Sequence, residues 1–363
     1  MFRDNDKINT EETTFFIIAS TIEVGTLTVS GNLAKEVGPD AWLAFLIGNL
    51  FTLIAIFIIV KLAQRFYKHG FAEFSRIIAG PVIGWILSAV LVVYWIAVSA
   101  RVMRASTDLV RTTLLDRTPI WVIAFSIMLI AVYLCWNGLE PLCRVSLTTV
   151  VVILPLITLI TLSLLSEVKI DNFLPFLAEG PQKVLKSAIM QLGDIEEMTF
   201  MLFLVPFMKK PEKAMKAALF GLYIPVFLAF FSIVTQIGIL GVELTKIYLS
   251  PGVAVLEELQ LPGAFVERLG VAYSGLWIIL VFPTICGLLY AIVLTLSQMF
   301  GTKSHRPFII PVVILTYIIS IIPGNTLEFE KFFMFLEPYG LIVSFVIPLL
   351  LYITAVIRGV KDE

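Results

Sequence analysis

The chain has 363 residues, of which 59% are hydrophobic and only 15% are charged, and its mean hydropathy is +0.97. Soluble domains average roughly 45–50% apolar and about 25% charged residues, so the composition excludes a soluble globular protein and indicates a polytopic membrane protein. The formal net charge of -1 argues against a protein that binds nucleic acid by electrostatic attraction.

Ten apolar segments are long enough to cross a bilayer, which requires roughly 20 residues of helix. They are residues 13–33, 42–61, 82–103, 119–136, 145–165, 184–208, 214–242, 269–299, 307–323 and 335–357. The sequence therefore predicts one all-α integral membrane domain, residues 1–363, with about ten transmembrane helices. Basic residues gather in the short connections MKKPEKAMK and KLAQRFYKHG, on the side of the N-terminus. This bias places both termini in the cytoplasm.

The ten segments divide into two halves of five, residues 13–166 and 183–357. Because five is an odd number, the second half must enter the membrane from the opposite side, which is the arithmetic of an inverted repeat. Gly25 lies near the middle of the first segment, and Gly193 holds the corresponding place in the sixth. Matched interruptions in two inverted halves predict broken helices and a binding site near the membrane midplane.

Acidic residues accompany both glycines, although a charged side chain at the centre of a membrane helix costs roughly 2.5–3.5 kcal/mol. A polar cavity would remove most of that cost. We therefore predict breaks at Val24–Thr26 and Leu192–Asp194, with unwound backbone and carboxylates forming a small-molecule site. Asp194 and Glu197 share a helical face, whereas Glu196 is expected to reach an interface or pair with Lys186. The predicted ligand site comprises Glu23, Val24, Gly25, Thr26, Gly193, Asp194 and Glu197.

Outside the two breaks, three aromatic residues are candidates for the pocket: Tyr94 and Trp95 in the third span and Tyr290 in the eighth. The charged residues Arg101, Arg104, Asp108 and Arg111 recur every three or four positions, which predicts the solvated face of a helical extension. The three cysteines follow no metal-binding spacing, and there are only two histidines. We expect no metal and no cofactor. No catalytic motif indicates an enzyme.

Four stretches resemble the B subunits of bacterial spore germination receptors. They are LAKEVGPDAWLAFLIG after the first span, LGDIEEMTFMLFLVPFMKKPEKAMKA around the sixth, LPGAFVERLGVAYSGLWIILVF before the eighth, and the segment from Glu140 to Arg144. The similarity covers nearly the whole chain. It implies membership of the amino acid–polyamine–cation permease superfamily, and hence the LeuT-like five-plus-five inverted repeat with broken first and sixth helices.

The resemblance implies a subunit that senses a germinant, usually an amino acid, in the inner membrane of the spore. Its implied partners are an A-type membrane subunit and a C-type lipoprotein subunit. By the same resemblance, Gly25 corresponds to the unwound first helix and Gly193–Asp194 to the break in the sixth. Cys286 and Tyr290 correspond to the pocket-facing part of the eighth helix.

A proton- or sodium-coupled amino-acid transporter of the same fold is the alternative, since fold alone does not separate the two functions. Close carboxylates at Glu23 and Asp194 would favour the transporter, because each raises the pKa of the other and so enables proton carriage. The resemblance favours the receptor. A structural membrane subunit without a ligand is disfavoured by the cost of buried acids.

Overall fold

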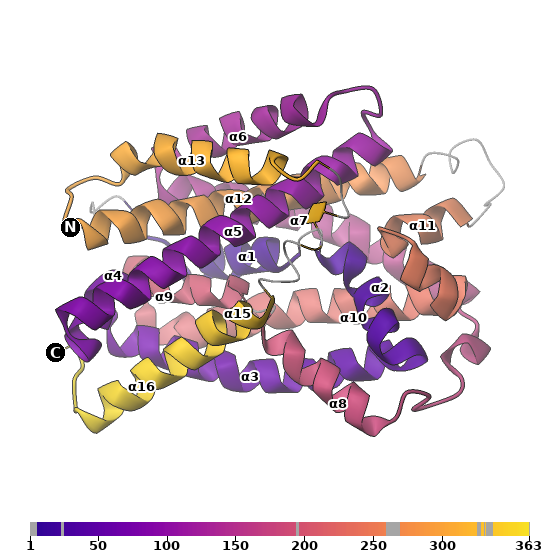
Figure 1. The fold of residues 1–363 in the computed structure, drawn as a ribbon, viewed down its shortest axis with the longest axis horizontal. Helices are drawn as coiled ribbons and strands as arrows, with labels where there is room; N and C mark the ends of the chain where they lie inside the picture. The colour runs from indigo at the N-terminus through magenta and orange to yellow at the C-terminus, as the bar shows by residue number, and fades with distance from the viewer. Residues whose placement is uncertain are drawn as a thin grey trace.

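The computed structural model describes residues 6–22, 25–193, 196–258, 269–324, 328–329, 331 and 337–362. Within these residues the fold is helical, apart from an isolated bridge between Ile8 and Met208. Figure 1 shows long helices running side by side, as in a membrane bundle. The helices are α1 Thr10–Thr21, α2 Gly25–Val37, α3 Ala41–Arg65, α4 Phe71–Ala79, α5 Pro81–Thr113, α6 Ile120–Asn137, α7 Leu139–Ser163, α8 Pro181–Met190, α9 Met201–Leu204, α10 Ala214–Ile247, α11 Pro251–Glu258, α12 Leu269–Met299, α13 Arg306–Ile321, α15 Glu337–Leu341 and α16 Ile347–Ile357.

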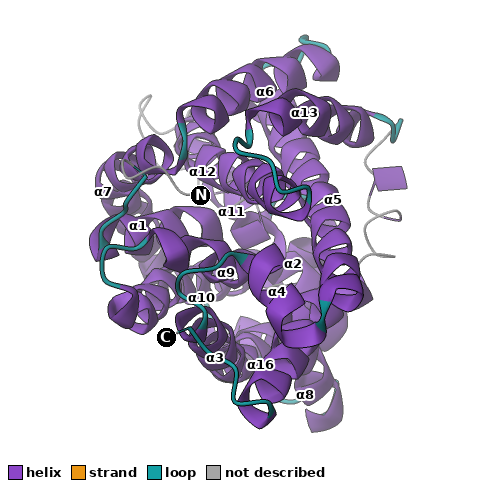
Figure 2. Cartoon of the chain, turned by 90° about the vertical axis from the view of Figure 1, so that its left-hand side faces the viewer, coloured by secondary structure: helices purple, strands orange, loops and turns teal. Residues whose placement is uncertain are grey.

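Seven helices in the described part of the chain are long and apolar enough to cross a membrane. They account for seven of the ten predicted segments. The other three fall short for two physical reasons. The segments at 13–33 and 184–208 are divided into shorter pieces, and the segment at 307–323 forms the 16-residue helix α13. Seen end-on in Figure 2, α6 and α13 lie at one edge of the bundle, α3 and α16 lie at the opposite edge, and α1 and α9 lie between them.

The first predicted helix is broken. Helix α1 ends at Thr21, and the next residue, Ile22, leaves the helical region with φ -85° and ψ 76°. Helix α2 begins at Gly25, so the interruption precedes that glycine and Thr26 already belongs to the second half-helix. Glu23 and Val24 lie outside the described residues.

The sixth predicted helix is broken as well. Helix α8 ends at Met190 and tightens into a 3-10 turn over Gln191–Gly193. The described chain resumes in a second 3-10 turn, Glu196–Phe200, which leads into the short helix α9. Asp194 lies outside the described residues. The prediction of paired broken helices is confirmed.

Glycines bring α1 close to its neighbours. A Cβ added to Gly221 on α10 would lie 2.6 Å from a side-chain carbon of Ile17, and one added to Gly287 on α12 would lie 2.5 Å from the Phe16 ring. Phe16 and Ile17 are both fully buried. Small residues at helix contacts allow such close approach in membranes, where packing rather than burial from water drives association. The first half-helix is therefore held tightly in the bundle.

The N-terminal segment is tied to the chain that leaves the sixth helix. The N–H of Ile8 donates to the carbonyl of Phe207, and the N–H of Lys209 donates back to the carbonyl of Ile8, each at 2.9 Å. Asp6 lies beside the first residues of α7, and burial raises the pKa of its carboxyl, although a backbone hydrogen bond at Glu140 opposes that rise.

The C-terminal segment packs against the connection between α3 and α4. The Arg65 guanidinium donates to the carbonyl of Val360 at 2.6 Å, and the N–H of Lys68 donates to the carboxylate of Asp362 at 2.7 Å. Both termini lie at the same end of the bundle in Figure 1. An even number of crossings, as the sequence predicts, places them there.

The predicted solvated face on the third span is wrong at its centre. Arg104 is only 4% exposed and pairs with Asp108 at 3.0 Å. Its guanidinium also donates to the carbonyls of Ser320 and Pro323, at 3.2 and 2.8 Å, and lies over the ring of Phe329. The end of α13 and the chain that follows it cover this face, so the charges join two helices instead of facing water.

Candidate functional site at the two helix breaks

The C-terminal end of α1 leaves carbonyl groups without helical partners, as every helix end does. The Thr284 hydroxyl on α12 donates to the carbonyl of Ser20 at 3.1 Å and approaches that of Ala19 at 3.5 Å. The hydroxyl of Ser20 is fully buried and has no hydrogen-bond partner among the described residues. An unpaired buried hydroxyl is costly. A hydrogen-bond partner supplied by a ligand would remove that cost.

The sixth helix approaches the same region through its second 3-10 turn, which contacts both α1 and α12. Glu197 on this turn is 7% exposed, and Thr199 is fully buried. The indole N–H of Trp95 on α5 donates to the hydroxyl of Thr199 at 3.1 Å. The two broken helices therefore meet one another beside α5 and α12.

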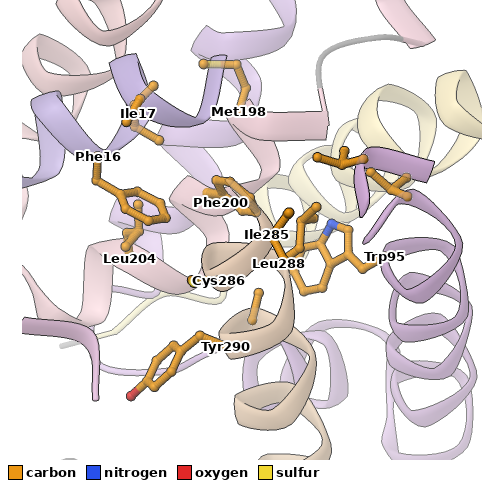
Figure 3. Packing of buried hydrophobic residues seen from close by; sticks show 14 of the residues in the cluster. Phe16, Ile17, Trp95, Met198, Phe200, Leu204, Ile285, Cys286, Leu288 and Tyr290 are labelled. Carbon is orange, nitrogen blue, oxygen red and sulfur yellow. The ribbon is translucent and has the colours of Figure 1, made fainter. Parts of the chain in front are cut away.

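Aromatic rings fill the space between these elements. The rings of Phe16 on α1 and Phe200 lie 5.5 Å apart, and those of Trp95 and Phe203 lie 6.2 Å apart at a steep angle. Figure 3 shows Phe16 and Phe200 on one side of α12 and Trp95 on the other. Such contacts give an apolar surround in which a few polar groups determine ligand orientation.

The structure brings most of the described candidate residues to this region, whereas Tyr290 lies apart from them. Tyr94 is buried on α5 next to Trp95, and Thr26 is buried in the first turn of α2. Gly25 opens α2 and Gly193 ends the turn after α8, so each flanks a break. Glu197 lies on the turn that contacts α1.

Cys286 and Tyr290 lie further along α12. Cys286 is buried, and its carbonyl accepts a contact from the thiol of Cys135 on α6 at 3.6 Å. The ring of Tyr290 lies 5.1 Å from that of His305, and in Figure 3 its hydroxyl points away from the other labelled residues. Tyr290 lines a cavity of about 100 Å³ near Asp6 and Gly138, at the end where the termini lie. It does not join the break.

Sequence reasoning missed Thr284 and Ser20. Thr284 follows Pro283, which interrupts the hydrogen bonding of α12 from within. A hydroxyl directly after a proline in a membrane helix was the available signal. Nothing in the sequence shows which carbonyls that hydroxyl reaches, because its partners lie more than 260 residues away.

The described residues include no group of three or more His, Cys, Asp or Glu side chains placed to hold a metal ion. The predicted cavity shared by the two breaks involves Glu23, Val24 and Asp194, which lie outside the described residues, so the shared cavity stays a prediction.

Residues 7–328 match the protein family described as "Spore germination protein". The chain is 32% identical to spore germination protein YndE of Bacillus subtilis (strain 168) over 330 residues, which cover 90% of each chain. Among solved structures it resembles MhsT in complex with L-phenylalanine, with a TM-score of 0.70, 14% identity and coverage of 96% of this chain and 89% of that chain.

A second solved structure is MHP1, a nucleobase-cation-symport-1 family transporter in a closed conformation with bromovinylhydantoin bound. Its TM-score is 0.68 at 14% identity, over 93% of this chain and 77% of that chain. At these identities the two structures show the fold alone, which is the all-α, LeuT-like membrane fold predicted from the sequence. The family match spans most of the chain and the YndE relative exceeds 30% identity, so this protein belongs to the spore germination permease family.

Proposed function

We propose that this chain is the germinant-sensing membrane subunit of a spore germination receptor, and that it binds its germinant between the broken first and sixth helices. Family membership supports the germination role. The location is supported by the meeting of the two breaks beside α5 and α12, where the buried Ser20 hydroxyl has no partner in the described part of the chain. Binding there shifts a conformational equilibrium that partner subunits detect.

The germinant is a small amphipathic molecule, an amino acid in this proposal. Helix α2 begins at Gly25, and the N–H groups and positive end of a helix N-terminus suit a carboxylate. Carboxylates at Glu23 and Asp194 supply acceptors for an ammonium group, and the rings of Phe200 and Trp95 suit an apolar side chain. MhsT, with the same fold, was solved in complex with L-phenylalanine.

The partners in this proposal are an A-type membrane subunit and a C-type lipoprotein subunit, in the inner membrane of the spore with both termini in the cytoplasm. The chain is an integral membrane protein of a permease-like family. The shared end of the two termini and the basic segments near it support the orientation.

Purified protein should bind at least one of the twenty protein amino acids in a thermal-shift and calorimetric screen. The affinity of the Gly25→Leu variant for that amino acid should be at least tenfold lower, because a bulky helix former at the first position of α2 favours a continuous helix. The melting temperature without ligand should stay near that of the wild type. Wild-type affinity in Gly25→Leu would remove the break from the binding site.

Similarity in fold to the transporter MHP1 favours a second candidate, an ion-coupled amino-acid transporter. Proteoliposomes loaded with the bound amino acid separate the two functions. A receptor should bind without net flux, whereas a transporter should accumulate the amino acid when a sodium or proton gradient is imposed. Gradient-driven uptake would replace the receptor proposal.

A further inference from the structure

The second half of the broken first helix, α2, ends far from the termini, where it packs against α10 and α11 (Figure 1). Two glycines make the packing close. A Cβ on Gly31 of α2 would lie 3.0 Å from the carbonyl oxygen of Thr245, and one on Gly252 of α11 would lie 2.8 Å from Leu27. Helix α2 therefore meets residues of α10 and α11 that lie over 200 positions later in the sequence.

Helix α10 is interrupted at this point. Gly241 has φ 75° and ψ 168°, a conformation that a residue with a side chain rarely adopts. The interruption frees carbonyl groups from the helical pattern. The Thr245 hydroxyl donates to the carbonyl of Gly241 at 2.7 Å and to that of Gln236 at 3.3 Å. The bend is thus a stabilised feature of the fold.

Gln236 lies at the centre of this junction and is 1% exposed. Its side-chain oxygen accepts a hydrogen bond from the hydroxyl of Ser30 on α2, and its side-chain nitrogen donates to the hydroxyl of Ser232 at 2.6 Å. A Cβ on Gly252 of α11 would lie 3.0 Å from the same nitrogen. One buried amide thus bonds α2 to α10 and packs against α11.

A buried amide destabilises the fold unless its hydrogen bonds are made. The two hydrogen bonds of the Gln236 side chain are directional, whereas apolar packing is not. Ser30 lies five residues, less than two helical turns, beyond the start of α2 at Gly25. Movement of α2 at the break must therefore either carry α10 and α11 with it or break the Ser30–Gln236 hydrogen bond.

We propose that Gln236 is a positioning residue that joins α2, the bend of α10 and α11 into one moving unit. Given the germinant site proposed above, this unit transmits the ligand-dependent position of α2 to the end of the bundle opposite the termini. Within the described residues the Gln236 side chain bonds to Ser30 and Ser232 and not to a residue at the break, so its loss should separate binding from response.

The test compares Gln236→Met, which keeps the side-chain length and removes both hydrogen bonds, with wild type. In spores that carry this receptor alone, the germination rate should fall at least tenfold. Affinity of the purified variant for the amino acid found in the screen should stay within threefold of wild type. Equal loss of affinity and germination, or a normal germination rate at normal abundance, would overturn the proposal.

Two further variants guard against a simple folding defect. Gly252→Ala, whose added carbon would crowd both Leu27 and the Gln236 side-chain nitrogen, should show the same separation of binding from response. Gly275→Ala, on α12 with no atom of the described residues within 4 Å of the added carbon, should leave both binding and germination unchanged. Wild-type germination by Gly252→Ala would exclude α11 from the moving unit.

A measurement without ligand keeps this inference distinct from the proposed function. Hydrogen exchange in Gln236→Met should rise at least tenfold in both 25–37 and 251–258, because both segments lose one anchor. If wild type binds none of the twenty amino acids, the proposed function fails while this joint rise still supports the coupling. A rise confined to α10, or none, would refute the coupling.

Discussion

Replacing Arg104 with methionine should lower the free energy of unfolding by about 3–5 kcal/mol, the usual cost of removing one partner from a buried ion pair. The change leaves Asp108 as an uncompensated buried carboxylate and deprives the carbonyls of Ser320 and Pro323 of their donor. Thermal unfolding of the purified protein in detergent measures the loss. We expect a strongly reduced melting temperature and low abundance in membranes.

Two controls separate this pair from a general effect of charge. Arg111→Met, at an exposed position on the same helix, should change stability by no more than about 0.5 kcal/mol. Combining Arg104→Met with Asp108→Leu should restore part of the loss, because a buried ion pair replaced by apolar residues is often neutral. Equal melting temperatures for Arg104→Met and Arg111→Met would contradict the burial argument.

The face around Arg104 also shows where periodicity stops being informative. Charged residues every three or four positions indicate one side of a helix, and that side exists on α5. Whether water or protein covers it depends on the path of the chain after α13, where Pro323 and Phe329 meet Arg104. No local pattern contains that path, so the sequence could predict the face but not its burial.

The fold was predictable because its signals are local and repeated. Long apolar segments predict membrane helices, and glycines at matching positions in the two inverted halves predict interruptions in both. The break positions were accurate to a few residues: α1 ends at Thr21 and α2 starts at Gly25, beside the predicted interval. Helix ends depend on tertiary partners and are the least certain part of any such prediction.

The site was predictable only in part. Gly25 and Gly193 flank the breaks as expected, because glycine is favoured where the backbone departs from regular helix. Cys286 and Tyr290 are four residues apart on one face of α12, yet one helical turn moves Tyr290 about 6 Å along the axis. That distance places it beside His305, away from the break. Residue spacing gives the distance between two side chains along a helix, but not the level at which a break in a neighbouring helix lies.

Replacing Gly287 with valine should destabilise the protein by at least about 1–3 kcal/mol, the usual cost of forcing extra carbon atoms into a packed core. The added Cβ alone would lie 2.5 Å from the Phe16 ring, a distance that real contacts do not reach. Phe16 is fully buried and packs on Phe200, so it has little room to move. The displacement would push α1 from α12 and disturb the break, which begins at Ile22, less than two turns beyond Phe16.

Gly275→Val on the same helix is the matched control, because no described atom lies within 4 Å of a carbon added there. Valine carries the same helix-propensity change at both positions, so the difference between the two melting temperatures measures the contact with α1 alone. We expect Gly275→Val to melt near wild type and Gly287→Val well below it. Pairing Gly287→Ala with Phe16→Leu should recover stability relative to Gly287→Ala, since the smaller side chain makes room for the new carbon. Similar melting temperatures for Gly287→Val and Gly275→Val would show that α1 does not depend on this close approach.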